Sequence, residues 1–179
     1  NLDGTDLRIL TDGDGTHRWE FNADHSLFID RWSRVDFPEV VQLRNSQKGS
    51  VVAKLFSQDI SELRRQNFTT PIRFASAGRD GQTMIYGTLI LPSHFDPEKS
   101  YPLVELIYAG PQDFHVPKQF GIQIAERRLA ELGFIIARID GMGTNWRSKR
   151  FHDVCWKNLS DAGLPDRIAW LKAAAEQYS

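Results

Sequence analysis

The sequence predicts a mixed α/β fold in which antiparallel strands come first and alternating strands and helices follow. Residues 1–57 contain short strand-like runs separated by polar turns. The pattern changes near Asn67, where two strands flank a Gly-rich hairpin loop. After this hairpin the order is strand, helix, strand, helix, which is typical of an α/β sheet with an antiparallel edge.

Several short strands are expected in the first part of the chain, over residues 7–11, 17–21, 26–33, 40–44 and 50–55. Their regular spacing indicates a meander, such as one blade of a β-propeller. A single blade has exposed edges and little core, so we expect it to belong to something larger. A short charged helix or linker over residues 59–66 ends this part.

The second part is expected to form strands over residues 71–77, 83–91, 103–108 and 134–139 and helices over 117–132 and 165–178. Pro117 and Gly133 are the start and stop signals of the first helix. The runs at 103–108 and 134–139 are almost continuously apolar, as buried strands of a sheet are. The chain ends where we expect the next strand, so the predicted sheet is partial.

Charge and composition indicate which partners to expect. With 22 basic and 23 acidic side chains the formal net charge is −1, which gives no electrostatic reason to expect nucleic acid. No run approaches the roughly 18 apolar residues of a membrane span, so no membrane segment is expected in this chain. The single Cys155 cannot form an internal disulfide. The histidines have no metal-ligand spacing, and we expect neither metal nor cofactor.

Tyr108 is the most informative candidate for a functional residue. It follows the apolar run of the predicted strand and precedes Ala109-Gly110-Pro111, a turn. This order would place a phenol at the carboxyl edge of the sheet, where open α/β folds bind ligands. The residues alone leave a second interpretation open, in which Tyr108 is an aromatic side chain that caps the end of the strand.

Two further motifs have a structural and a functional interpretation. Gly141-Met142-Gly143 after a strand is similar to a dinucleotide fingerprint, but Trp146 occupies the third glycine position and a tight loop is the better prediction. His152, Asp153 and Cys155 suggest a catalytic pair or metal site. Neighbouring helical residues do not face each other, however, so a structural histidine is predicted.

The sequence contains no Gly-x-Ser-x-Gly, the sharp turn on which hydrolases of the α/β class carry their nucleophile. The nearest approach is Phe74-Ala75-Ser76-Ala77-Gly78, which lacks the first glycine and precedes a hairpin rather than a helix. No Ser-x-x-Lys is present either.

The ordered motifs Tyr-x-Gly-Pro at 108–111, Asp-Gly-x-Gly-Thr at 140–144 and Arg-Phe-His-Asp at 150–153 resemble the prolyl oligopeptidase family of serine peptidases, most closely its dipeptidyl peptidase IV branch. The segments at 17–24 and 26–33 look like the last blade of that branch's propeller. The resemblance implies a partial α/β-hydrolase sheet preceded by antiparallel β strands from the end of a β-propeller. Residues 1–66 would be the C-terminal blade with its linker, and 67–179 the N-terminal half of the hydrolase domain.

The resemblance also implies a function. Members cleave short peptides, often after proline, through an acyl-enzyme, and Tyr108 matches the tyrosine whose hydroxyl helps form the oxyanion hole. The catalytic Ser, Asp and His would lie beyond this chain, so we expect the chain alone to be inactive unless a companion chain supplies them. A homo-oligomer is a further expectation. Two alternatives remain: a non-catalytic binding module with a hydrolase-like fold, or a related hydrolase such as an acylaminoacyl peptidase or an esterase.

Overall fold

The computed structural model describes residues 3–178, which form two compact units. The first unit contains the described residues up to Asn67 together with Lys118–Gly121. The second contains Phe68–Pro117 and the chain from Ile122 onward. The assignment of residues 1–66 to a propeller blade and of 67–179 to a hydrolase domain stays a prediction.

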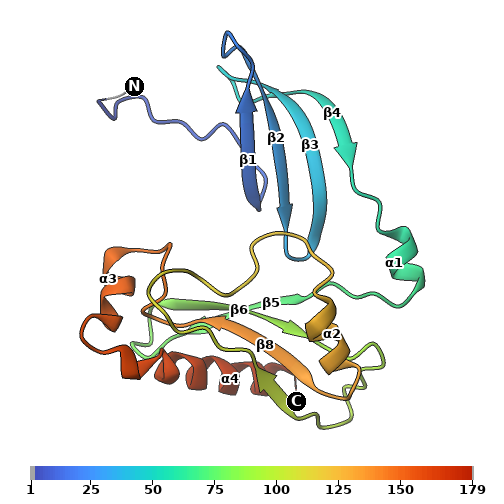
Figure 1. The fold of residues 1–179 in the computed structure, drawn as a ribbon, viewed down its shortest axis with the longest axis vertical. Helices are drawn as coiled ribbons and strands as arrows, with labels where there is room; N and C mark the ends of the chain where they lie inside the picture. The colour runs from blue at the N-terminus through green and yellow to red at the C-terminus, as the bar shows by residue number, and fades with distance from the viewer. Residues whose placement is uncertain (1–2, 179) are drawn as a thin grey trace. The chain divides into compact units, whose positions relative to one another are not determined.

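The first unit is built on sheet A, a four-stranded antiparallel meander in the order β1-β2-β3-β4. The strands are β1 (Thr16–Phe21), β2 (Leu27–Arg34), β3 (Phe37–Asn45) and β4 (Val51–Ser57). Figure 1 shows them side by side in sequence order. Four of the five predicted strands are confirmed.

The predicted strand over residues 7–11 is wrong, because this segment has no strand partner. Leu7 and Ile9 are 92% and 89% exposed, so the alternation of apolar side chains here does not mark a covered face. The segment lies instead against the turn after β3. A Cβ on Gly49 would come within 2.5 Å of the Leu10 carbonyl oxygen, an approach that only glycine permits.

A cluster of charged side chains lies within the first unit. Asp30 on β2 is fully buried and accepts from His17 Nδ1 at 2.7 Å. Its other carboxylate oxygen pairs with Arg44 Nε at 2.9 Å, and Arg44 is 3% exposed. Arg44 also reaches Asp12 and the Gly49 carbonyl, each at 2.8 Å. The cluster therefore joins the segment before β1 to the first three strands and to the turn after β3.

The connection between the two sheets contains the short helix α1 (Ser61–Arg65). The Asp59 carboxylate accepts the backbone N–H of Ser61 at 2.8 Å, which is the local contact that turns the chain into the helix. The charged helix predicted over residues 59–66 is confirmed in a shorter form.

Sheet B of the second unit has the order β5-β6-β8-β7. Its strands are β5 (Ile72–Ala77), β6 (Met84–Ile90), β7 (Leu103–Glu105) and β8 (Ile135–Asp140). β6 runs antiparallel to both of its neighbours, β5 and β8, and β7 pairs with β8 in parallel. The predicted α/β sheet with an antiparallel edge is confirmed. Ser76 of the Phe74–Gly78 motif lies within β5, not at a strand-to-helix turn.

β7 is shorter than predicted. The ladder with β8 pairs Leu103 with Ile135 and Glu105 with Ala137, and Leu106 adds one more bond to the Ala137 carbonyl at 2.9 Å. Beyond it the Tyr108 carbonyl accepts from a side chain, Arg167 Nη2, at 2.8 Å. The apolar run therefore continues past the end of the strand, and Tyr108 lies in the loop that follows.

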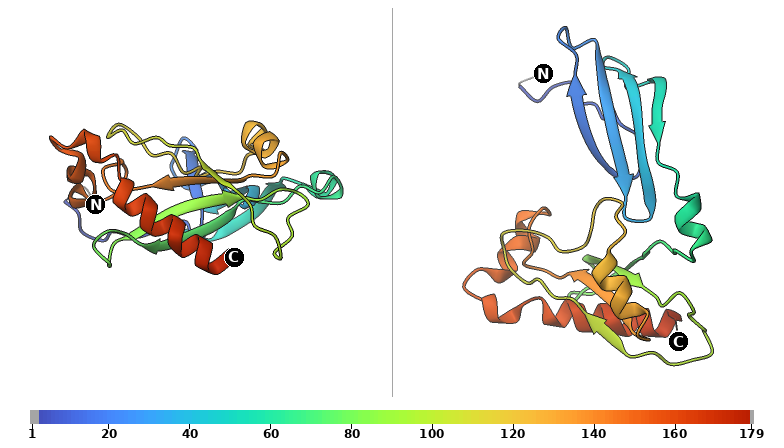
Figure 2. Two further views of the ribbon diagram at one scale, coloured as in Figure 1. Left: turned by 90° about the horizontal axis from the view of Figure 1, so that it is seen from below. Right: turned by 45° about the vertical axis from the view of Figure 1, so that its right-hand side comes forward.

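The helices cover sheet B on opposite faces, as Figure 2 (left) shows for α4 and α2. α4 (Leu164–Tyr178) packs Trp170 and Ala174 against Ile85, Ala137 and Ile139. α2 (Ile124–Ala130) packs against the other face, where Ile136 is buried. Alternate residues of β8 thus enter the two cores, as the pleat of a strand requires.

The helix predicted over residues 117–132 begins seven residues late, at Ile124. Residues 118–121 belong to the first unit, where their backbone is held by side chains of β1 and β2. Thr16 Oγ1 donates to the Lys118 carbonyl at 2.9 Å, and the Phe120 N–H donates to Ser33 Oγ at 3.2 Å. These contacts hold the backbone in a non-helical path, and Gln123 then takes a positive φ of 53°.

Candidate active site

Two loops meet at the carboxyl ends of the parallel strands β7 and β8. The first runs from Leu106 to Pro117 and the second from Gly141 to Arg147, and we call them the β7 loop and the β8 loop. Asn145 joins them: its N–H donates to the Asp113 carbonyl at 3.1 Å and its side-chain amide to the Gln112 carbonyl at 3.2 Å. This is the edge of the sheet at which open α/β folds bind ligands.

Tyr108 lies at the start of the β7 loop and is half-buried. Its hydroxyl donates to Gln112 Oε1 at 3.2 Å, and its ring lies against His115 with 6.2 Å between centroids. A Cβ on Gly110 would come within 2.8 Å of the hydroxyl oxygen, so a side chain there would displace the phenol. The glycine of Tyr-x-Gly-Pro thus leaves room for the tyrosine to fold back over its own loop.

Asp140, the last residue of β8, holds the far part of the β7 loop. It is 4% exposed and accepts the N–H groups of His115 at 2.6 Å and Val116 at 3.1 Å. Burial lowers the pKa of His115, and the nearby Arg138 lowers it further, while Asp140 opposes both effects. A neutral imidazole therefore packs beside the Tyr108 ring.

The Gly-Met-Gly segment of the β8 loop is a tight turn, as predicted. Gly143 has a φ of +105°, and a Cβ there would lie 3.0 Å from that of Cys155. The Gly143 N–H donates to the Phe151 carbonyl at 2.9 Å, and Thr144 Oγ1 donates to the Gly141 carbonyl at 3.0 Å. The loop's own polar groups are occupied by these bonds, which is the pattern of a structural turn.

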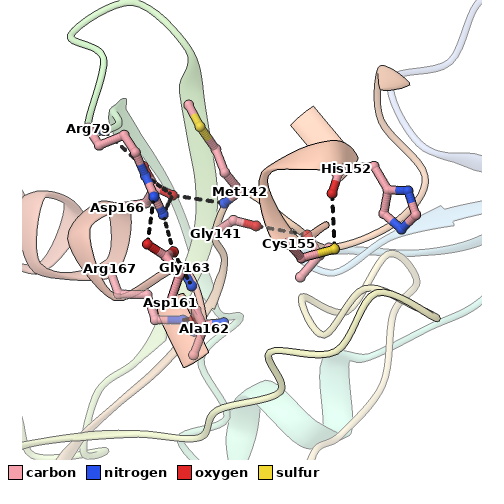
Figure 3. Close-up of polar contacts among 11 residues, drawn as sticks. Arg79, Gly141, Met142, His152, Cys155, Asp161, Ala162, Gly163, Asp166 and Arg167 are labelled. Carbon is pink, nitrogen blue, oxygen red and sulfur yellow. Dashed lines mark hydrogen bonds and ion pairs between the residues drawn. The ribbon is translucent and has the colours of Figure 1, made fainter. Parts of the chain in front are cut away.

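His152 is a structural residue, as predicted, and its partner lies in the β7 loop. Its Nε2 lies 2.8 Å from the Pro111 carbonyl and therefore donates to it. Cys155 Sγ donates to the backbone carbonyl of His152 at 3.1 Å, and Asp153 pairs with Lys149. Figure 3 shows the imidazole turned away from the thiol, so the three residues do not form a catalytic pair.

A network that the sequence did not predict ties α4 to the β8 loop (Figure 3). Asp166 in the first turn of α4 is fully buried, and its carboxylate accepts the Met142 N–H at 2.9 Å. It also binds the Arg79 guanidinium, which pairs with Asp161 as well. Both carboxylates raise the pKa of Arg79, and Arg79 lowers that of Asp161. No local sequence pattern links these residues, because Met142 lies 24 positions from Asp166, and Arg79 lies 82 and 87 positions from its two carboxylates.

The next residue, Arg167, ties α4 to the β7 loop. It is 1% exposed and was not among the predicted site residues. Its guanidinium binds the Glu105 carboxylate and donates to the carbonyls of Tyr108 at 2.8 Å and Ala162 at 3.1 Å. A charged residue near the start of an otherwise amphipathic helix was the only available signal.

Within residues 3–178 no group of three or more His, Cys, Asp or Glu side chains is arranged to hold a metal ion. Over the same range, no helix is both long and apolar enough to cross a membrane.

A parallel pair beside antiparallel strands, with helices on both faces and two loops at the carboxyl edge, places the second unit in the α/β class. Comparison with solved structures defines the fold further. The putative dipeptidyl aminopeptidase IV of Bacteroides ovatus superimposes with a TM-score of 0.81 at 22% identity, over 96% of this chain and 25% of that one. Dipeptidyl peptidase 4 of Porphyromonas gingivalis superimposes with a TM-score of 0.74 at 22% identity, over 92% of this chain and 24% of that one.

Sequence comparisons find the same group of proteins as the comparison of structures. Residues 119–179 match the sequence model described as Prolyl oligopeptidase family. Probable dipeptidyl-aminopeptidase B of Aspergillus terreus is 26% identical over 181 residues, which are 98% of this chain and 20% of that protein. Its counterpart in Trichophyton verrucosum is 22% identical over 176 residues, 96% and 20% respectively. The chain thus spans about one fifth of the length of these curated relatives.

The predicted resemblance to the prolyl oligopeptidase family and its dipeptidyl peptidase IV branch is therefore confirmed. The predicted fold class is confirmed as well: the chain is α/β, with antiparallel strands that precede a partial mixed sheet, in the fold of these two solved structures.

Proposed function

We propose that this chain is part of a serine-type dipeptidyl peptidase that cleaves short peptides, often after proline, through an acyl-enzyme. Within it Tyr108 donates one hydrogen bond to the oxyanion of the acyl-transfer intermediate. The observation that carries the proposal is the position of Tyr108 in a Tyr-x-Gly-Pro segment at the start of the loop that follows the parallel strand β7. The relatives named dipeptidyl-aminopeptidase B support the substrate class.

The chemistry of Tyr108 suits this role. A phenol hydroxyl is a hydrogen-bond donor. In the structure its hydroxyl donates to a neutral amide oxygen, Gln112 Oε1, at a long 3.2 Å. An oxyanion accepts a stronger, charge-assisted bond, so the hydroxyl would exchange partners when negative charge develops on the substrate.

The nucleophile, its Asp and its His are expected outside this chain, since the sequence contains no Gly-x-Ser-x-Gly. We therefore expect activity from the full-length protein and none from these 179 residues alone. A companion chain or a homo-oligomer stays a prediction, and a peptide is the proposed substrate.

The test is hydrolysis of a Gly-Pro chromogenic substrate by the full-length protein. Tyr108→Phe should lower kcat on the order of 10²–10³-fold, because one oxyanion donor is removed. Tyr86→Phe is the matched control, since Tyr86 lies on β6 of the same unit and is 49% exposed. An unchanged kcat in Tyr108→Phe would show that the role assignment is wrong.

The same protein separates the two alternatives. Failure of a fluorophosphonate to label any serine, together with no hydrolysis, would favour the non-catalytic binding module. Labelling with hydrolysis of acylaminoacyl or ester substrates, and not of the Gly-Pro substrate, would favour the related hydrolases.

A further inference from the structure

We propose that Arg167 is a positioning residue for Tyr108. Its buried guanidinium fixes the point at which β7 ends and, with it, the backbone from which the phenol projects. The inference rests on the proposed function, because it assigns Arg167 a role in catalysis only through the Tyr108 hydroxyl.

The first step of the argument is the set of Arg167 contacts. Nη1 pairs with the Glu105 carboxylate on β7, Nη2 donates to the Tyr108 carbonyl at 2.8 Å, and Nε donates to the Ala162 carbonyl at 3.1 Å. The three acceptors lie in the strand, in the β7 loop and in the turn before α4. A planar guanidinium has a rigid fork of donors, so it sets the spacing between these segments as a single point charge could not.

The second step is the end of the sheet ladder. The bond from Leu106 to Ala137 is the last that the β7 segment makes to β8. Two residues further on, the Arg167 side chain takes the place of a strand neighbour at the Tyr108 carbonyl. The backbone of the tyrosine is thus held by a side chain from α4, while among residues 3–178 its hydroxyl donates to Gln112 of the same loop.

The third step is burial. Arg167 is 1% exposed and the Glu105 side chain 10%, so neither charge can be solvated by water if the other is removed. Loss of Arg167 would leave a buried carboxylate at the end of β7, and the loop would have to move to hydrate it. Because a misplacement of about 1 Å can cost on the order of 10²-fold in rate, such a movement would be visible in kcat.

The neighbouring residue Asp166 shows that this arrangement is specific to Arg167. Both residues are buried in the first turn of α4, but Asp166 binds Met142 and Arg79 and has no hydrogen bond or ion pair to Tyr108. Asp166 therefore holds the β8 loop, and Arg167 holds the β7 loop.

The test is a double-mutant cycle in the full-length protein, with the Gly-Pro chromogenic substrate. Arg167→Met combined with Glu105→Gln removes the guanidinium without leaving a buried charge. We expect kcat to fall roughly 10–100-fold and KM to change less than about threefold. In a Tyr108→Phe background the same pair of substitutions should lower kcat less than about twofold, because no hydroxyl remains to be misplaced. Arg167→Lys should restore part of the activity.

A structural role alone predicts a different result. Trp170 is fully buried about one turn further along α4. Trp170→Phe should lower the melting temperature, and any loss of kcat should be the same with and without the Tyr108 hydroxyl. Equal losses of kcat with and without the Tyr108 hydroxyl would overturn the proposal. If the double variant does not fold, Arg167→Lys and Glu105→Gln are each carried through the same cycle.

Crystal structures separate this inference from the proposed function. If Tyr108→Phe leaves kcat unchanged, the oxyanion role fails, and the position of the Tyr108 backbone in Arg167→Met/Glu105→Gln becomes the deciding measurement. A displaced Tyr108 would support positioning by Arg167. An undisplaced Tyr108 would contradict it whatever the kinetics.

Discussion

Sheets A and B each have four strands, but they are stabilised in different ways. Sheet B is covered by α4 and α2, and Ile85, Ile139 and Trp170 have no exposed surface. Both units bury charged side chains, Asp166 and Arg167 on α4 and Asp30 and Arg44 in the unit of sheet A, but in sheet A the buried ion pair joins two neighbouring strands, β2 and β3. The outer strand β4 leaves its apolar side chains 46–57% exposed (Val51, Val52, Leu55 and Phe56). The comparison teaches that apolar clusters hold sheet B on both faces, whereas sheet A buries fewer apolar side chains and has a buried ion pair between β2 and β3.

The largest expected effect concerns the apolar core of sheet B. Trp170→Ala should destabilise this unit by about 3–5 kcal/mol, because it removes a large aromatic ring that packs against Phe74 and leaves a cavity. Amide hydrogen exchange in the full-length protein measures the effect strand by strand. Exchange should become faster in β6 and β8.

Trp156→Ala is the matched control, since Trp156 is 75% exposed, and it should change stability by no more than about 0.5 kcal/mol. Faster exchange in β2 and β3 after Trp170→Ala, to the same extent as in β8, would contradict the division into two differently stabilised units.

An intermediate effect is expected from the charged cluster of sheet A. Asp30→Asn keeps the size of the side chain but replaces its charge, so His17 and Arg44 lose their shared carboxylate. We expect a loss of about 1–3 kcal/mol, the range for a buried polar group left without its partner. Exchange should become faster in β2 and β3.

Asp12→Asn tests whether burial is the cause. Asp12 binds the same Arg44 at 2.8 Å, but its side chain is 87% exposed, so the expected loss is below about 1 kcal/mol. Equal losses of stability in the two variants would show that the burial of Asp30 does not determine its contribution to stability.

The smallest effect is a pH dependence at the hairpin between β5 and β6. The Thr83 hydroxyl, the Thr83 N–H and the Gln82 N–H donate to the Asp80 carboxylate and lower its pKa from 3.8 to about 2. Since the folded pKa is below the unfolded one, this stabilisation is complete above about pH 4 and is lost as pH falls through about 2.

Hydrogen exchange of the Thr83 amide measures this effect. In the wild type, the protection of this amide should decrease as the pH is lowered. Asp80→Asn should remove that pH dependence, and the same dependence in the variant would assign it to another group.

The sequence predicted elements better than it predicted their ends. Eight of the strand predictions hold because period-2 patterns and turn residues act locally. The helix predicted from Pro117 starts late because Thr16 and Ser33, about 87 or more positions away, bind its first residues. β7 ends early for a similar reason, since Arg167 takes the Tyr108 carbonyl. Both errors come from side-chain contacts between distant segments, which no local pattern records.

In the candidate site, too, the local motif was predicted and the contacts between distant segments were not. Tyr108 was predicted from the motif in which it lies, although its role stays a prediction. The partners that hold its loop (Asp140, Asn145, His152 and Arg167) were not predicted, because each contact joins residues at least 24 positions apart. Asp166 and Arg167 at the start of α4 bind backbone groups of the two loops, and neither belongs to a motif for ligand binding or nucleophilic catalysis.

Adjacent placement of Asp166 and Arg167 also limits how this region can change in length. Successive helical residues point about 100° apart, and here one direction faces the amide of Met142 and the other the carbonyl of Tyr108. One residue inserted between Gly163 and Asp166 would rotate both side chains together. The acid would then face the Tyr108 carbonyl, another acceptor, and the base would turn to the half-exposed direction that Ile168 now takes. We therefore expect insertions and deletions to be rare in this short stretch, whereas the exposed residues 97–100 should tolerate changes in length.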